Sequence, residues 1–429
     1  MKLFLNSEKK IKNILLIFFL LIPFALITGS FLPDLFLTLS SIILIIFLIK
    51  NDELKLFNKK FFFYFLLLYS LFILSSLAST NIKLSIQSSI FYIRFIIFIF
   101  VTIYLIKKNK NLFNYLFYIL IIIYSFLFLD TLFQFFNGKN IIGLYYPQET
   151  NFRNTSFFGD RGILGSYTVR LLPLLLALIS IKFNKNLYYK NYFIISYIFL
   201  SGAIILLSGE RTSLFLFCLF IFLTFIFVAD IRKPIFLSFL IFIFFSFFAL
   251  SSSEKLYSRI IKQPFDQIFE FNKNTQESIQ NNKKQFTIFS NIYESHYKIA
   301  LKMFKEKPIF GHGPKMFRDY CNRPENYLSE GACTTHPHNV LLQLLSETGF
   351  ITTSFVYFFF CYIFFLLIRN LFLKSKEKIS QPQLFLMILI VVNLFPFSPS
   401  GNFFNNWLNV VYYYPIGVFF SLTLRKKIK

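Results

Sequence analysis

Long parts of the sequence contain almost no charged residue. The runs 14–28, 61–77 and 235–250 are nearly free of charge, and only 15% of the 429 residues are charged. The chain is also 56% hydrophobic and has 66 Phe. A soluble fold of this size must keep polar residues on its surface, so the composition excludes one. Each run approaches the roughly 20 residues that cross about 30 Å of hydrocarbon, which predicts an all-α, polytopic integral membrane protein.

Several familiar motifs are absent. The sequence has no P-loop, Rossmann fingerprint, Ser-His-Asp arrangement or Asp-x-Asp signature, so a nucleotide-sugar donor is unsupported. Its formal net charge of +24 comes without a long basic stripe or a nucleic-acid motif, and we predict no nucleic-acid partner. No small-residue cleavage site follows the basic N-terminal stretch, which we interpret as the start of an uncleaved first helix.

About twelve apolar runs could each span a membrane. They divide the chain into nine spans over 1–251, a large, partly helical loop over 252–349, and three spans over 350–429. The eleventh run is short and is broken by Pro396. The runs are 13–29, 31–49, 61–79, 88–106, 112–135, 162–181, 191–208, 212–230, 234–251, 350–369, 383–397 and 405–424.

The basic residues are distributed very unequally between the two sides of these spans. With the N-terminus inside, 24 lysines and arginines fall on the inner side, and five fall in the short outer loops. The five are Lys83, Lys139, Arg153, Arg161 and Arg211. Because cytoplasmic loops carry the excess of basic residues, we predict an inner-membrane protein with both termini in the cytoplasm and an outer, periplasmic loop. Membrane lipids are its predicted surroundings.

The large loop divides into two kinds of sequence. The stretch Phe271–Gln285 is polar and predicts a mobile surface loop. Helical spacing over 293–304 and over 339–348 predicts two helices, with Gly349 as the C-cap of the second.

Arginines at two places on the predicted outer face could bind an anion. Arg153 and Arg161 precede the sixth span and could also be interfacial anchors, whereas Arg170 lies too deep to reach the surface easily. Arg211 follows Glu210 in the turn after the seventh span. It could pair with Glu210 and cap the hairpin, or present a guanidinium fork to phosphate oxygens.

A histidine-proline-histidine run occupies the end of the loop. His336 and His338 flank a proline just before the predicted helix, with Asn339 next to them. A neutral histidine can take a proton from an attacking hydroxyl, and either ring could instead be structural. A zinc site of His336, His338 and His312 is an alternative, although no usual ligand spacing is present, so we expect no metal and no cofactor.

Two cysteines precede this run. Cys321 and Cys333 lie twelve positions apart in the outer loop. They could form a disulfide that holds the histidine segment, or remain free thiols.

These segments resemble the O-antigen ligase and O-antigen polymerase superfamily of bacterial envelope glycosyltransferases. The resemblance rests, in chain order, on the following segments: FRNTSFFGDRGILGSYTVRLLP, LLSGERTS, GHGPKMFRDYC and CTTHPHNVLLQLLSETG. These segments cover about a seventh of the chain. Their order agrees with that of the family, and so does the long loop between the ninth and tenth spans.

The resemblance implies a GT-C-like, metal-independent and inverting glycosyl transfer at the periplasmic face. The donor would be an undecaprenyl-pyrophosphate-linked glycan, and the acceptor a sugar hydroxyl of lipid A-core. By resemblance, Arg211, Arg153 and Arg170 would bind the pyrophosphate, and His338 would be the general base. Family members often carry an acidic residue where this chain has Arg161, so we assign Arg161 only a supporting role, together with the neighbours of the main residues. These are Glu210, His336 and Asn339.

Two other functions stay open. A polymerase that joins lipid-linked repeat units would share these motifs, and the single large loop with its late histidine favours the ligase. A transporter or flippase for lipid-linked glycans would need polar residues in many spans and usually internal repeats. Here the only charged residues inside spans are Arg94, Asp130 and Arg170, and the sequence has no internal repeat.

Overall fold

The computed structural model describes residues 2–51, 59–145, 153–269, 291–326, 328, 331–374 and 377–426. These residues form helices and short connections. The described part of the chain has no β-strand beyond an isolated bridge between Lys139 and Tyr145. The prediction of an all-helical, polytopic membrane protein is confirmed. The predicted surface loop Phe271–Gln285 lies outside the described residues.

All twelve predicted runs coincide with apolar helices. The helices are α1 (Lys2–Thr28), α2 (Phe31–Lys50), α3 (Lys59–Leu77), α4 and α5 (Ile82–Ile90 and Ile93–Lys108), α6 (Leu112–Asn137), α7 (Leu164–Lys182), α8 (Leu187–Leu207), α9 (Arg211–Phe227), α10 (Arg232–Ser252), α15 (Val340–Phe372), α16 (Gln381–Asn393) and α17 (Asn406–Lys426). Among the described residues nine are long and apolar enough to cross a membrane. Apolar stretches in α3, α9 and α16 are shorter, so the count of twelve is not confirmed.

The predicted fourth span, 88–106, is not one continuous helix. α4 ends at Ile90 and α5 begins at Ile93. Arg94 explains the break, because its Nη1 donates to the carbonyl oxygen of Phe91 at 2.8 Å. Its Nε and Nη2 donate to the two carboxylate oxygens of Asp34 at 2.9 and 3.1 Å. Arg94, which lies inside the predicted fourth span, is therefore paired with Asp34 at the N-terminal end of α5.

α5, α7, α16 and α17 form the interior of the helix assembly. In the apolar stretch of α7, 89% of the residues are buried inside the protein, against 22% in the apolar stretch of α10. α7 is rich in leucine and packs on α6, α8 and α16, whereas α10 exposes phenylalanines on its outer face. A helix that is apolar all round and buried all round needs neighbours on every side, which makes α7 the scaffold for the residues at its N-terminal end.

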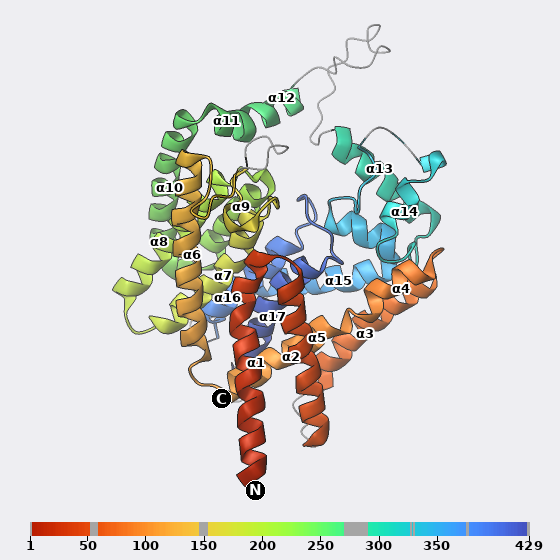
Figure 1. Cartoon of the computed structure of the whole chain (residues 1–429), viewed down its shortest axis with the longest axis horizontal. Coiled ribbons are helices and arrows are strands. Elements are labelled where there is room, and N and C mark those ends of the chain that lie inside the picture. Colours follow the sequence, from red (N-terminus) through yellow and green to blue (C-terminus); the bar gives the residue numbers. More distant parts are fainter. Residues whose placement is uncertain are drawn as a thin grey trace.

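The four helices between α10 and α15 lie toward one end of the assembly. They are α11 (Glu254–Tyr257), α12 (Gln263–Phe269), α13 (Asn291–Glu306) and α14 (Phe317–Cys321), and both chain termini lie toward the opposite end (Figure 1). α13 and α14 share a small core that includes Ile299, Met303 and Phe317. The helix predicted over 293–304 is thus present, and its apolar side packs on α14.

Gly349 turns α15 sharply. Its φ of 74° and ψ of −179° are not helical, so the segment Val340–Thr348 ends there, as the sequence predicted. A Cβ on Gly349 would lie 2.2 Å from the carbonyl oxygen of Ile309. Only glycine allows this approach, which docks the 308–313 segment on the bend.

Candidate functional site

A buried carboxylate fixes the turn between α8 and α9. Glu210 accepts hydrogen bonds from the backbone N–H of Gly165 at 2.7 Å and of Ser166 at 3.1 Å, and from Ser213 Oγ at 2.9 Å. Burial raises the pKa of Glu210, and these hydrogen bonds oppose the rise. A Cβ on Gly165 would lie 2.9 Å from the Cβ of Ser213, so the close approach needs glycine. Glu210 thereby caps α7 and positions Arg211 above it.

Arg153 and Arg211 lie at this end of α7. A Cβ on Gly162 would be 2.6 Å from Arg153 Nη1, so the Arg153 side chain lies across a position that only glycine leaves open. Arg153 Nε is buried and has no hydrogen-bond partner among the described residues. Arg211 Nη2 donates to Gln263 Oε1 at 2.9 Å, which ties the start of α9 to α12.

A third arginine, Arg259, joins them. It is buried in the turn of π-helix after α11, and its Nε donates to the carbonyl oxygen of Gly209 at 2.7 Å. Burial and then the positive charges of Arg153 and Arg211 lower the pKa of Arg259 to about 10, while Glu210 acts in the opposite direction. We call Arg153, Arg211 and Arg259 the arginine group.

Sequence reasoning missed Arg259. The residue belongs to none of the motifs, and its only sequence signal is its place shortly after the ninth span, on the same side as Arg211. The arginine group brings together three separate loops. Glu210, the carboxylate whose charge acts on Arg259, is already held by the N-terminal end of α7. Such a concentration of cations suits a ligand with several negative charges.

The histidine turn is fixed on the segment before α17. Asn339 caps α15 and donates from Nδ2 to the carbonyl oxygen of Pro396 at 2.7 Å. His336 Nε2 lies 3.2 Å from the carbonyl oxygen of Ser400, and Nδ1 lies 2.9 Å from Thr335 Oγ1. A carbonyl only accepts, so Nε2 of His336 carries the proton and Nδ1 accepts from the hydroxyl. Both ring nitrogens are occupied, which makes His336 a structural residue.

His338 is placed differently. It is half-buried and has a φ of 55°, in the left-handed region that a histidine seldom adopts. Its ring centroid lies 4.1 Å from that of His336, 5.3 Å from His296 and 5.6 Å from Tyr293. Burial, then the neighbouring His296, lower the pKa of His338 to about 4, although the Ser400 carbonyl raises it. The imidazole is therefore neutral near pH 7 and able to accept a proton.

Tyr293 connects His338 with the arginine group. Its ring, in the first turn of α13, stands at 90° to the ring of His338. The same residue lies near enough to Arg211 to interact with its charge. Sequence reasoning noted only the helical segment around Tyr293, because nothing in the linear order relates it to Arg211. Tyr293 therefore relates the proton acceptor to the cations, since it packs on His338 and lies within reach of the charge of Arg211.

Metal ligands do not gather at this site. Within the described ranges, no three His, Cys, Asp or Glu side chains are grouped so that they could hold a metal ion. His312 instead places Nε2 3.0 Å from the carbonyl oxygen of Met303 and packs on Tyr320. The zinc alternative of His312, His336 and His338 thus has no ligand set here.

Comparison with known families gives one match. Residues 196–357 match the family model described as O-antigen ligase. The match covers a little over a third of the chain and supports the O-antigen ligase and polymerase superfamily. A search of curated proteins finds no match. Activity of the O-antigen ligase or polymerase type follows at this coarse level, as does a multi-pass membrane protein.

The superfamily segment contains four of the site residues. Arg211, Arg259, Tyr293 and His338 all lie within 196–357, and Arg153 precedes it. The match therefore covers both the proton acceptor and two of the three cations, although the geometry that joins them was found independently.

Arg170 lies deeper than the arginine group. Its Nη1 donates to Ser166 Oγ at 2.6 Å, and its guanidinium carbon lies 5.6 Å from the centre of the Tyr412 ring. Ser166 in turn donates to Glu210, so Arg170 is linked to the site through one residue. The side chain is buried, and Nε has no hydrogen-bond partner in the described part of the chain.

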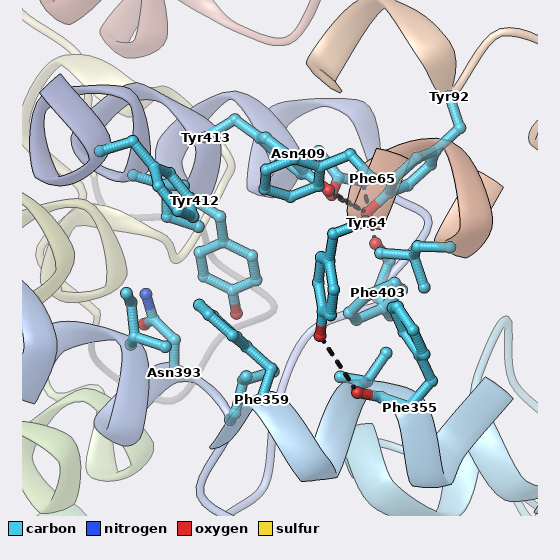
Figure 2. Close-up of a pocket in the computed structure, with 16 residues that line it drawn as sticks. Tyr64, Phe65, Tyr92, Phe355, Phe359, Asn393, Phe403, Asn409, Tyr412 and Tyr413 are labelled. Atoms are coloured by element: carbon cyan, nitrogen blue, oxygen red, sulfur yellow. Dashed lines mark hydrogen bonds between the residues drawn. The ribbon is translucent and has the colours of Figure 1, made fainter. Parts of the chain in front are cut away.

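A pocket of about 90 Å³ lies beside Tyr412, among α3, α15, α16 and α17. Its lining is largely aromatic, and Tyr64 Oη donates to the carbonyl oxygen of Phe355 at 3.3 Å (Figure 2). Tyr412 Oη and Asn393 Oδ1 have no hydrogen-bond partner among the described residues. Neither His338 nor the arginine group lines this pocket, so it is distinct from the candidate site.

The remaining predicted residues lie around the site. Arg161 is exposed and lies beside the turn between α1 and α2, because its Nη1 would be 3.2 Å from a Cβ on Gly29. Cys321 and Cys333 form a disulfide with a Cα–Cα distance of 5.2 Å. The disulfide joins the end of α14 to the segment that leads into the histidine turn.

Proposed function

We propose that this protein transfers a glycan from undecaprenyl pyrophosphate to a sugar hydroxyl of lipid A-core, at the periplasmic face of the inner membrane. The observation that supports this best is that Tyr293 packs on the neutral His338 and also lies within reach of the charge of Arg211, one of three clustered arginines. In this proposal the segment 252–349 is the periplasmic loop, and both termini are cytoplasmic. The spans on either side, 1–251 and 350–429, form the membrane domain.

The arginine group would bind the donor pyrophosphate. Guanidinium groups present paired N–H donors that match phosphate oxygens. Three of them offset the negative charge that develops on the leaving pyrophosphate, which is the role a metal ion plays in other transferases. The proposed transfer is therefore metal-independent. Arg170, linked through Ser166 to Glu210, would support this binding from below.

His338 would accept the proton of the acceptor hydroxyl. The acceptor oxygen forms a bond to the anomeric carbon while the bond between that carbon and the pyrophosphate oxygen breaks. Undecaprenyl pyrophosphate leaves with the bonding electrons, and the proton stays on the imidazole. Attack opposite the leaving group inverts the anomeric carbon. Bound pyrophosphate would raise the pKa of His338 from about 4 toward neutrality, which makes it a stronger base.

A polymerase is the second candidate. It would use the same donor and the same base, but its acceptor would be another lipid-linked glycan. The two activities differ in their products rather than in the residues described here. A transporter of lipid-linked glycans is less well supported, because the embedded Arg94 is paired with Asp34 and so does not provide a free charge along a polar path.

Product analysis with purified protein tests the proposal. Wild-type protein should move the glycan from undecaprenyl pyrophosphate to lipid A-core, with the opposite anomeric configuration and without loss of rate in a chelator. His338→Ala should lower kcat at least about a hundredfold, the usual contribution of a general base. His336→Ala should also reduce activity, but through a lower thermal unfolding midpoint that His338→Ala does not share.

Three outcomes would contradict parts of this proposal. Growth of the lipid-linked glycan in place of transfer to lipid A-core would identify a polymerase. Full transfer by His338→Ala would exclude the general-base role. Loss of activity in chelator that zinc restores would exclude the metal-independent mechanism.

A further inference from the structure

A second pair of cations lies on the α14 side of the histidine turn. Lys315 precedes α14 and Arg318 lies in its first turn, one on each side of Phe317. The backbone N–H of Phe317 donates to Glu347 Oε1 at 3.1 Å. Both cations therefore flank the point at which α14 is attached to the buried carboxylate of Glu347.

The charge of Glu347 acts on both cations, but within the described ranges neither is held in a direct ion pair. Neither Lys315 nor Arg318 forms an ion pair within 4.0 Å among the described residues. Arg318 Nε is buried there without a hydrogen-bond partner. The two oxygens of Glu347 are already engaged by Phe317 and by Gln343 Nε2 at 2.9 Å. Buried donors without partners are costly, so a ligand that accepts hydrogen bonds would stabilise them.

The backbone that presents Lys315 is held rigidly. Lys315 has a φ of 65°, in the left-handed region that lysine rarely adopts. Gly313 donates its N–H to the carbonyl oxygen of Glu347 at 2.7 Å, and a Cβ there would lie 2.6 Å from Ser85 Oγ. The close contact of Gly313 with Ser85 and the strained backbone of Lys315 together fix the direction of the loop before α14. Such strain is common at binding sites.

The histidine turn lies between this pair and the arginine group. α14 and α4 are on one side of the assembly, whereas α9 and α11 are on the other (Figure 1). The charge of Arg318 acts on His336, whose ring is 4.1 Å from that of His338. On the other side of His338, the ring of Tyr293 packs on the imidazole, and Tyr293 also interacts with the charge of Arg211.

We propose that Lys315 and Arg318 bind a phosphate group of the acceptor glycolipid. This inference rests on the proposed glycosyl transfer, because it assumes that the arginine group is occupied by the donor. An acceptor hydroxyl must approach the anomeric carbon from the side opposite the leaving pyrophosphate, which is the α14 side of His338. Phosphate on lipid A-core and pyrophosphate on a lipid-linked glycan offer the same oxygens to these cations.

Kinetics with separate donor and acceptor titrations test the site. Lys315→Gln and Arg318→Gln should each raise the acceptor KM roughly tenfold, the loss typical of one charge-assisted hydrogen bond. The donor KM should stay within about twofold in both variants. The exchange Lys315→Arg with Arg318→Lys keeps both charges and should recover most of the acceptor affinity. Lys305→Gln, at an exposed lysine of α13, is the matched control.

Acceptors that lack phosphate separate the possible sources without any variant. Wild-type protein should lose about the same factor in acceptor KM when the lipid A-core, or the lipid-linked acceptor, is stripped of phosphate. Whichever acceptor shows this loss carries the recognised group. Equal acceptor KM values for the phosphorylated and stripped forms would overturn the site while wild-type transfer continues. Absence of transfer by the wild-type protein would instead overturn the proposed function.

Discussion

Burial and mutual repulsion act together on the arginine group at the scale of single residues. Burial alone lowers the pKa of Arg259, and the charges of Arg153 and Arg211 lower it further. A protein keeps such an arrangement where a ligand later supplies the negative charge, because the unliganded state is then less stable than the bound one. The sharpest test changes the shape of one donor and keeps its charge.

Arg259→Lys should weaken donor binding. Lysine retains the positive charge but has no planar fork, and it loses the Nε bond to the Gly209 carbonyl. We expect the donor KM to rise roughly tenfold with the acceptor KM unchanged, as measured by initial rates of transfer. Arg232→Lys is the control, since Arg232 Nε also donates to a carbonyl, that of Phe225, but lies exposed at the start of α10. An unchanged donor KM with a lower unfolding temperature would make Arg259 purely structural.

The two histidines show what could be predicted at this scale. The sequence identified both, and it left open which one would be reactive. Ser400 decides this, because its carbonyl fixes Nε2 of His336 from a segment 64 positions further along the chain. Tyr293 and Arg259 could not be identified from sequence for the same reason. Their roles depend on contacts between segments that no local pattern relates.

At the scale of helices, local sequence was most informative where a strong conformational rule applies. Gly349 was predicted as a C-cap, and its positive φ follows from the absence of a side chain. The break between α4 and α5 was not predicted. It depends on Arg94 reaching Asp34, sixty positions earlier, and no hydropathy pattern contains that pairing. Apolar runs thus locate helices well, and tertiary ion pairs decide where some of them end.

Gly349→Ala should detach the 308–313 segment from α15. The new Cβ would meet the Ile309 carbonyl oxygen at 2.2 Å and would also sit at a φ of 74°. We expect a loss of roughly 2–4 kcal/mol in unfolding free energy. Thermal unfolding in detergent, together with protease cleavage between α13 and α14, would measure it.

Gly143→Ala separates the two causes of that loss. Gly143 also has a positive φ, 91°, but a Cβ there has nothing within 4 Å. It should therefore cost only the backbone term, about 1–2 kcal/mol. Equal losses for the two variants would mean that the contact with Ile309 is unimportant.

At the scale of the whole molecule, the unequal distribution of charge predicts the sidedness of the chain, and the structure adds the grouping of the outer residues. The arginine group draws on three loops, at Arg153, Arg211 and Arg259, whose charges act on one another. Sequence placed two of them on one face through loop counting. The third required the fold, because a charge count does not say which loops touch.

The short helix α16 decides whether the span count, and with it the sidedness, is correct. Its 13 residues rise about 20 Å, less than the roughly 30 Å of the hydrocarbon core, so the flanking residues must complete a crossing. We expect Ser380→Cys to be on the cytoplasmic side and Phe397→Cys on the periplasmic side. Neither change removes a basic residue, so the charge pattern that directs insertion stays intact.

A membrane-impermeant thiol reagent on intact cells should therefore label only Phe397→Cys, in a chain whose Cys218 and Cys361 are replaced by serine. Ile142→Cys, in the connection between α6 and the longer α7, and Asn184→Cys, just after α7 ends, are the controls and should be labelled from the outside and the inside respectively. If neither α16 position is labelled from outside while the two controls behave as expected, α16 does not cross and the C-terminus lies on the periplasmic side, opposite to the one proposed.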